Sequence, residues 1–173
     1  MNSFLKKHST RKNILILLGI VIILEILFKV CLPKGDNAIM IDMAFATQAS
    51  QIFSIISNYT PNMCQSYILG ALTLDVLFPI VYFLLFAFLL YAKWEKTWMI
   101  FIPLAQAISD LCENAGIITL IKSWPEQLVG LANFVVVIAW VKWGLCLITI
   151  LLILLGIIRT KYNKPKSNNL SNE

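Results

Sequence analysis

The sequence ISDLCENAGI, residues 108–117, holds three polar side chains within five positions: Asp110, Glu113 and Asn114. Their spacing of i, i+3 and i+4 places all three on one face of a helix. Two carboxyl groups and an amide that share a face can exchange protons, bind a cation or hold the polar part of a ligand. The flanking residues are apolar over 98–121, so this chemistry is predicted to lie inside a membrane-spanning helix.

The composition indicates a membrane protein. The chain has 173 residues, of which 59% are hydrophobic and 13% are charged, whereas about 25% of the residues of a soluble domain are charged. Four segments reach the roughly 20 apolar residues that a spanning helix needs. These segments are residues 14–32, 67–91, 98–121 and 133–158. The sequence therefore predicts an all-α fold, a four-helix transmembrane bundle over residues 14–158.

The connection between the first two predicted spans, residues 33–66, is long enough to hold a further element. Within residues 39–59, apolar side chains recur at helical spacing with polar ones between them. This pattern predicts one amphipathic helix on the outer membrane surface. At the two ends of the chain, residues 1–13 are predicted to be a basic tail and residues 159–173 a disordered polar tail.

Lysine and arginine are distributed unevenly among the loops. Residues 1–13, 92–97 and 159–173 together hold ten, while the loops 33–66 and 122–132 hold two. Because basic loops remain in the cytoplasm, we predict an integral membrane protein with both termini cytoplasmic. The other interpretation of the first span, a secretory signal peptide, is disfavoured by its long apolar run and by the lack of an A-x-A site. Topology and anionic lipid headgroups account for the basic residues, so no nucleic-acid binding is predicted.

The charged residues of the four predicted spans and Asn114 lie at similar depths, apart from Lys29, which is three residues from the outer end of its span. Counted from the outer end of each span, the others are seven to eleven residues in, roughly 10–17 Å at 1.5 Å per residue. The residues of this layer are Glu25, Asp75, Asp110, Glu113, Asn114 and Lys142. A charge at such a depth must face the bundle interior and find a partner there. The four spans are therefore predicted to meet in one polar layer in the outer half of the membrane.

Pro79 is expected to alter the helix around this layer. It lacks the N–H that would bond to the carbonyl of Asp75, which predicts a kink and a free carbonyl next to that acid, with Tyr82 nearby. In the first span, Glu25 and Lys29 stand at i and i+4 and could form an ion pair of their own.

The acids of the layer outnumber its bases. If Glu25 and Lys29 pair with each other, Lys142 alone faces the remaining three carboxyl groups. Three close carboxylates beside one cation cannot all stay ionised in a medium of low dielectric constant. We therefore expect a proton, a cation or a charged ligand to balance them.

The polar layer is predicted to be a pocket for a lipid-like or small ligand, with or without catalysis. Asp110 and Glu113 are the candidate general acid and base. The candidate ligand-binding residues are Asp75, Tyr82, Asn114, Lys142 and Trp143. The sequence contains no metal-binding motif of the HExxH or CxxC type, and it identifies no cofactor.

Two other functions are compatible with the same layer. The polar residues could hold the helices together, or hold them against a partner membrane protein or a second copy of the chain. They could also belong to a proton- or ion-coupled transport component, although the inner halves of the spans contain no ionisable residue to complete a path. On the predicted outer side, Cys31 and Cys64 could form a disulfide or remain free thiols.

Three motifs carry a resemblance to a known group of proteins. LDVLFPIVY (74–82), PLAQAISDLCEN (103–114) and the pair Lys142–Trp143 resemble a family of small four-helix membrane proteins with an LDxxFPxxY helix, a DxxEN helix and a Lys-Trp helix. The resemblance covers residues 65–160 and implies a four-helix bundle but no particular activity. A more distant similarity links the acids and the Asn to the emopamil-binding, sterol isomerase-like proteins. Their histidine-containing acid pattern is missing here, because the single histidine is His8 in the N-terminal tail.

Overall fold

The computed structural model describes residues 2–31 and 40–162, and within these ranges the regular structure is helical, with no β-strand. The α-helices are α1 (Asn2–His8), α2 (Arg11–Cys31), α3 (Ala49–Ser57), α4 (Pro61–Leu72), α5 (Leu74–Trp94), α6 (Phe101–Ser123) and α7 (Val129–Tyr162). Two short 3₁₀ turns, η1 (Ile41–Met43) and η2 (Thr97–Ile100), lie between them. The predicted all-α fold is confirmed over the described residues.

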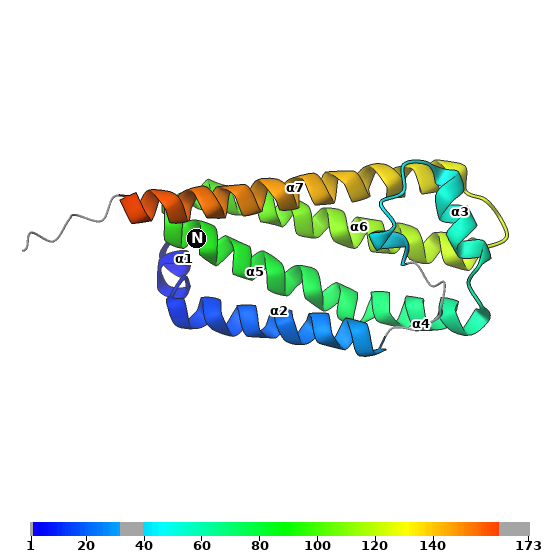
Figure 1. Cartoon of the computed structure of the whole chain (residues 1–173), viewed down its shortest axis with the longest axis horizontal. Coiled ribbons are helices and arrows are strands. Elements are labelled where there is room, and N and C mark those ends of the chain that lie inside the picture. Colours follow the sequence, from blue (N-terminus) through cyan, green and yellow to red (C-terminus); the bar gives the residue numbers. More distant parts are fainter. Residues whose placement is uncertain (1, 32–39, 163–173) are drawn as a thin grey trace, which may run out of the picture.

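The long helices run side by side and alternate in direction (Figure 1). α6 packs against both α5 and α7, while α2 lies against α5 on the side away from α7. The beginning of α2 and the end of α7 lie at the same end of the bundle, and α3 and α4 lie at the opposite end (Figure 1). The connection of helices in this order is that of an up-and-down bundle.

Three segments of the described chain are long and apolar enough to cross a membrane: Arg11–Val30, Pro61–Trp94 and Val129–Tyr162. They overlap three of the four predicted spans. The remaining predicted span, 98–121, begins in η2 and continues as α6, which has 23 residues, about 35 Å of helix and longer than the roughly 30 Å hydrocarbon core. Its mean hydropathy is lower because Gln106, Asp110, Glu113 and Asn114 interrupt the apolar sequence.

The second predicted span is not one continuous helix. It begins earlier, at Pro61, and Thr73 divides it into α4 and α5 with backbone angles of φ −115° and ψ −81°. Pro61 occupies the first turn of α4, where its missing N–H removes no helical hydrogen bond. The hydroxyl of Thr60 accepts a hydrogen bond from the N–H of Met63 at 3.3 Å and so caps this helix.

The prediction of a single amphipathic helix over 39–59 is wrong. Only Ala49–Ser57 form an α-helix, α3, and η1 precedes it. Phe45 between them has a φ of 47°, in the left-handed region that interrupts a right-handed helix. The side chain of Gln51 accepts hydrogen bonds from the N–H groups of Thr47, at 2.7 Å, and Gln48, at 3.4 Å, which starts α3 at this point. α3 itself is amphipathic and buries its apolar face, made of Ala49, Ile52, Phe53 and Ile56.

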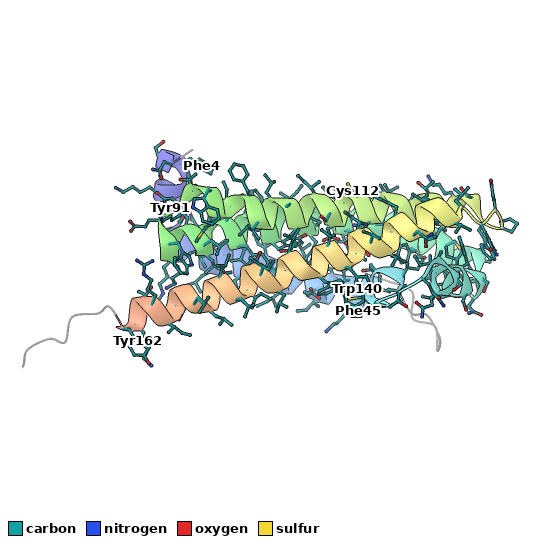
Figure 2. The ribbon with its side chains drawn as sticks, turned by 90° about the horizontal axis from the view of Figure 1, so that it is seen from above. Phe4, Phe45, Tyr91, Cys112, Trp140 and Tyr162 are labelled. Atoms are coloured by element: carbon teal, nitrogen blue, oxygen red, sulfur yellow. The ribbon has the colours of Figure 1, made fainter. Side chains whose placement is uncertain are left out.

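The N-terminal segment predicted as a basic tail also contains structure. α1 packs against the end of α5, where Leu5 is buried and the hydroxyl of Tyr91 donates a hydrogen bond to Oδ1 of Asn2 at 2.6 Å. Figure 2 shows Phe4 and Tyr91 at this end of the bundle, far from Phe45 and Trp140. The predicted C-terminal tail begins later than expected, because α7 continues to Tyr162; its remaining residues, 163–173, lie outside the described part of the chain.

Candidate functional site

Four of the predicted site residues form one buried cluster, contributed by three helices. The ammonium of Lys142 on α7 lies 3.2 Å from Oδ1 of Asp110 and 2.5 Å from Oε2 of Glu113, both on α6. The hydroxyl of Tyr82 on α5 donates a hydrogen bond to Oδ2 of Asp110 at 3.0 Å. We call Tyr82, Asp110, Glu113 and Lys142 the ionic cluster; each is less than 9% exposed.

The local structure of α6 explains why its acids converge on one lysine. Asp110 and Glu113 are one turn apart, so both carboxylates face α7 and the ammonium of Lys142 fits between them. α6 and α7 approach closely at Gly116, where a Cβ atom would lie 2.5 Å from Cγ2 of Val135. The small residue lets the two backbones come near enough for a lysine and two carboxylates to meet across the interface.

Asn114 has a different partner from the ionic cluster. Its Nδ2 donates a hydrogen bond to the backbone carbonyl of Asp75 at 3.3 Å. That carbonyl is the one that Pro79, four residues later, leaves without its helical donor. As predicted, the carbonyl of Asp75 lacks a donor from its own helix, and Asn114 of the neighbouring helix α6 supplies one instead.

Replacing Asn114 with Ala is expected to lower the free energy of unfolding by about 1 kcal/mol, because the carbonyl of Asp75 loses its donor in an apolar setting. In a Pro79→Ala background, residue 79 supplies its own N–H, so the same replacement is expected to have a smaller effect. Unfolding of the purified protein in mixed micelles measures both differences. Equal losses in the two backgrounds would show that Asn114 acts through another contact.

A cavity of about 730 Å³ lies beside the ionic cluster, between α2, α5, α6, α7 and the segment around η1. Its charged and polar lining residues include Asp75, Tyr82, Asp110, Lys142 and Trp143. Its apolar wall is formed by side chains of α2 and α5, among them Leu18, Val21, Phe28, Phe78, Leu85 and Phe86. Glu113 does not line this cavity and reaches it only through Lys142.

The structure adds three residues to this site that the sequence did not single out. Asp42, Gln106 and Cys146 all line the cavity. Gln106 carries a signal in the sequence, since it stands four residues before Asp110 and so shares its helix face. Asp42 lies in the connection that was expected to sit on the membrane surface, and no local pattern places it next to α7.

Asp42 lies in η1 and lines the cavity close to the ionic cluster. Its Oδ1 accepts a hydrogen bond from the hydroxyl of Tyr67 at 3.1 Å. Burial raises the pKa of the Asp42 carboxyl above its ordinary value, while Lys142 and the Tyr67 hydrogen bond act in the opposite direction and Asp110 adds to the rise. Asp42 is thus a fourth acid near one buried lysine.

The structure also bears on the ion pair expected between Glu25 and Lys29 and on the disulfide considered between Cys31 and Cys64. Glu25 and Lys29 both line the cavity but are exposed, and within the described part of the chain they form no ion pair with each other. Helix geometry permits the pair, yet in an exposed position it gains little over solvation or lipid headgroups. Cys64 is a free thiol, and the side chain of Cys31 lies outside the described residues.

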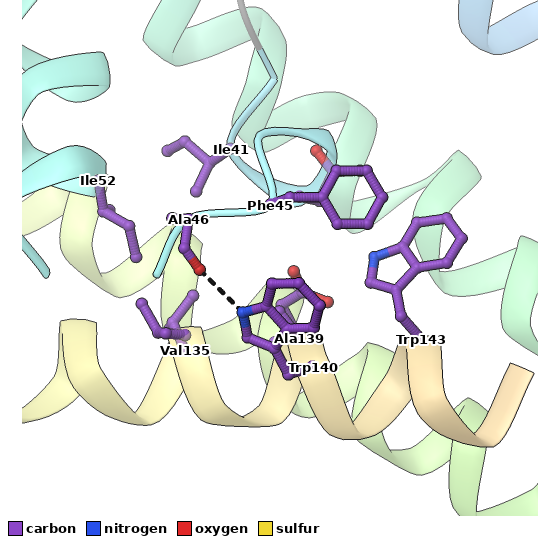
Figure 3. A pocket seen from close by; sticks show the side chains of 11 residues that line it. Ile41, Phe45, Ala46, Ile52, Val135, Ala139, Trp140 and Trp143 are labelled. Carbon is purple, nitrogen blue, oxygen red and sulfur yellow. Dashed lines mark hydrogen bonds between the residues drawn. The ribbon is translucent and has the colours of Figure 1, made fainter. Parts of the chain in front are cut away.

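A short segment covers the cluster from the side of α3. In Figure 3, Phe45 faces Trp143, and the indole N–H of Trp140 donates a hydrogen bond to the carbonyl of Ala46 at 3.1 Å. The ring centroid of Phe45 lies 6.1 Å from that of Trp140 and 5.2 Å from that of Trp143. These contacts fix residues 41–46 over the N-terminal half of α7.

Replacing Trp140 with Phe keeps an aromatic ring but removes the N–H donor. We expect the covering segment to open more often, with hydrogen exchange of residues 41–46 faster by about fivefold, the equivalent of about 1 kcal/mol. Exchange measured by mass spectrometry checks this, and Trp98→Phe, which alters an exposed indole, is the matched control. Equal exchange in both variants would contradict a holding role for Trp140.

Together, the long apolar helices and the buried ionic cluster define a helical, multi-pass membrane protein. No protein-family model, curated protein or solved structure matches the chain. Within residues 2–31 and 40–162, no group of three or more His, Cys, Asp or Glu side chains is placed to hold a metal ion.

Proposed function

We propose that the protein crosses the membrane four times, with both termini on the cytoplasmic side, and binds a lipid-like or small ligand in the cavity beside the ionic cluster. α6 supports the fourth crossing by the way its faces are used. Its polar residues Asp110, Glu113 and Asn114 are buried, whereas Phe101 and Ile108 are more than half exposed. An apolar outer face around a polar inner one is what a lipid-facing helix requires.

The orientation rests on where the basic residues lie in the fold. α1, the start of α2, η2 and the end of α7 gather at one end of the bundle (Figure 1). The basic residues of these segments and of the α5–η2 connection are Lys6, Lys7, Arg11, Lys12, Lys93, Lys96, Arg159 and Lys161. A cytoplasmic location of this end follows from the preference of basic loops for that side.

The observation that carries the proposal is the cavity itself. It combines about 730 Å³ of space, an apolar wall and a charged end formed by Asp110 and Lys142. Ligand sites in proteins have this composition, with mostly apolar walls and a few converging polar groups. A purely structural ion pair requires no such space beside it.

If the protein is an enzyme, Asp110 is the better candidate for the general acid or base. It lines the cavity and accepts hydrogen bonds from both Tyr82 and Lys142, which fix its carboxylate. Glu113 does not reach the cavity, so we assign it a positioning role through Lys142. Asp110 thus keeps the role expected from the sequence, whereas Glu113 does not.

The test is to purify the protein in a mild detergent and to identify retained small molecules by mass spectrometry. Each of the variants Asp110→Asn and Glu113→Gln leaves Lys142 one carboxylate, so both are expected to fold. We expect Asp110→Asn to retain at least about tenfold less ligand. Glu126→Gln, which changes an exposed acid in the α6–α7 connection, is the control. Unchanged retention in Asp110→Asn would contradict ligand binding at the cluster.

A structural role is the second candidate, favoured by the complete pairing of Lys142 with two carboxylates across the α6–α7 interface. Such a cluster could hold this bundle together or hold it against a partner membrane protein. In that case the purified protein is expected to retain a stoichiometric protein partner, or none, and no small molecule. The cellular phenotype of Asp110→Asn would then follow the amount of folded protein alone.

A further inference from the structure

The charges around the cavity do not balance. Asp42, Asp75 and Asp110 line it, Glu113 contacts its lysine, and Lys142 is the buried base that faces them. Four acids against this one base leave a formal excess of three negative charges. Glu25 and Lys29, exposed on the α2 side of the cavity, cancel each other in formal charge.

Lys142 cannot supply the missing charge for Asp75. Its ammonium is already engaged by Asp110 and Glu113. The carboxylate of Asp75 forms no ion pair and no side-chain hydrogen bond in the described part of the chain, although it lines the cavity. A buried or half-buried carboxylate without a partner is unfavourable in an apolar setting.

Uncharged groups around the cavity are also left without partners. Gln106 is 5% exposed, lines the cavity, and its Oε1 has no hydrogen-bond donor among the described residues. The indole N–H of Trp143, which also lines the cavity, is buried without an acceptor there. Buried polar atoms without partners are few in folded proteins, and an occupant of the adjoining space can satisfy them.

The apolar wall of the cavity indicates the chemistry of the part of the ligand that lies away from the acids. Val21 and Phe28 of α2 and Phe78, Leu85 and Phe86 of α5 face the cavity with hydrocarbon. An ion or a small polar molecule would satisfy the acids but leave this wall against empty space. A hydrocarbon chain of moderate length would fill it.

From these observations we propose that the ligand is an amphiphile with a protonated amine head and a hydrocarbon chain. The ammonium binds between Asp75 and Asp42, next to Asp110, and the chain lies along α2 and α5. This inference rests on the proposed function and deepens it by naming the ligand's chemical class. A free amine and an amine in a membrane lipid's headgroup present the same ammonium to the site, so the proposal covers both sources.

Three probes of equal chain length test the charge preference: octylamine, 1-octanol and octanoate, each added below its micelle concentration to the full chain in neutral detergent. Near saturation we expect octylamine to raise the midpoint of thermal unfolding by about 3 °C or more. We expect 1-octanol to have a much smaller effect and octanoate none. Mass spectrometry of lipids that co-purify with the protein then separates a free amine from an amine-bearing lipid as the source.

Variants at the residues proposed to contact the amine head and the hydrocarbon chain make the test specific. Asp75→Asn is expected to weaken octylamine binding at least about tenfold, and Asp42→Asn, in the covering segment, provides a second variant should the first fail to fold. Glu126→Gln is the matched control and is expected to bind as the parent does. Val21→Trp fills the apolar wall and is expected to abolish the shift.

The two proposals fail in different ways. If 1-octanol stabilises the protein as well as octylamine does, and Val21→Trp removes both effects, the cavity binds amphiphiles but the amine preference is wrong. If no probe shifts the unfolding midpoint and no lipid is retained, the ligand-binding function itself is wrong. Equal octylamine binding by the parent and by both acid variants also overturns the amine assignment.

Discussion

Replacing Lys142 with methionine is expected to lower the free energy of unfolding by about 3–5 kcal/mol, because the change leaves two carboxylates buried without a countercharge. Asp110 is 7% exposed and Glu113 is 1% exposed, so neither can recover solvation by a small movement. Methionine has a similar length and no charge, which limits the loss of packing. Unfolding in mixed micelles at increasing denaturing detergent measures the difference.

The matched experiment removes the whole charge set at once. Asp110→Asn and Glu113→Gln, combined with Lys142→Met, leave no unpaired charge, and this triple variant is expected to recover most of the lost stability. Such recovery would show that the penalty came from the uncompensated carboxylates and not from the missing lysine chain. Near-parental stability of Lys142→Met alone would contradict a pair of ionised acids at the cluster.

Replacing Gly116 with alanine is expected to lower the free energy of unfolding by about 1–3 kcal/mol, because the added methyl group overpacks the α6–α7 interface. Its Cβ would lie 2.5 Å from Cγ2 of Val135, a side chain that is itself only 2% exposed. Both neighbours are held in helices, so one backbone must shift. That shift would also separate Glu113, three residues earlier, from Lys142.

A second change and a control isolate this effect. Val135→Ala removes the clashing methyl, so the double variant is expected to be more stable than Gly116→Ala alone. Gly144→Ala on α7 adds a methyl that meets no other described residue within 4 Å beyond its chain neighbours and its own helix backbone, and it is expected to be neutral or slightly stabilising through helix propensity. The same loss in Gly116→Ala and Gly144→Ala would contradict a close approach at Gly116. Thermal unfolding in detergent distinguishes these cases.

Much of the helical arrangement could be predicted from local pattern. Apolar runs of about 20 residues require helices in a membrane, because their backbone groups must pair internally. The i, i+3 spacing of Asp110 and Glu113 fixes them on one face, whatever the rest of the fold does. The absence of an N–H at Pro79 likewise determines that the carbonyl of Asp75 needs another donor.

Breaks in helices were harder to predict. Thr73 divides the second predicted span, and the left-handed Phe45 ends the amphipathic pattern after η1. Neither residue type is a strong helix breaker on its own. Their conformations depend on packing, since Phe45 lies against Trp140 and Trp143, which are nearly one hundred residues away in the chain.

By itself, the sequence determined that acids and lysines deep in apolar spans should turn towards the bundle interior. Asp110, Glu113 and Lys142 are buried in this way, whereas Glu25 and Lys29 of α2 stay exposed beside the cavity. Only the tertiary structure decided the partners. Lys142 pairs with Asp110 and Glu113, and Asn114 donates a hydrogen bond to the carbonyl of Asp75. Asp42 lies at the cavity. The reason is physical: facing direction follows from helix periodicity, whereas partners depend on the rotation, spacing and depth of neighbouring helices, which side-chain packing sets.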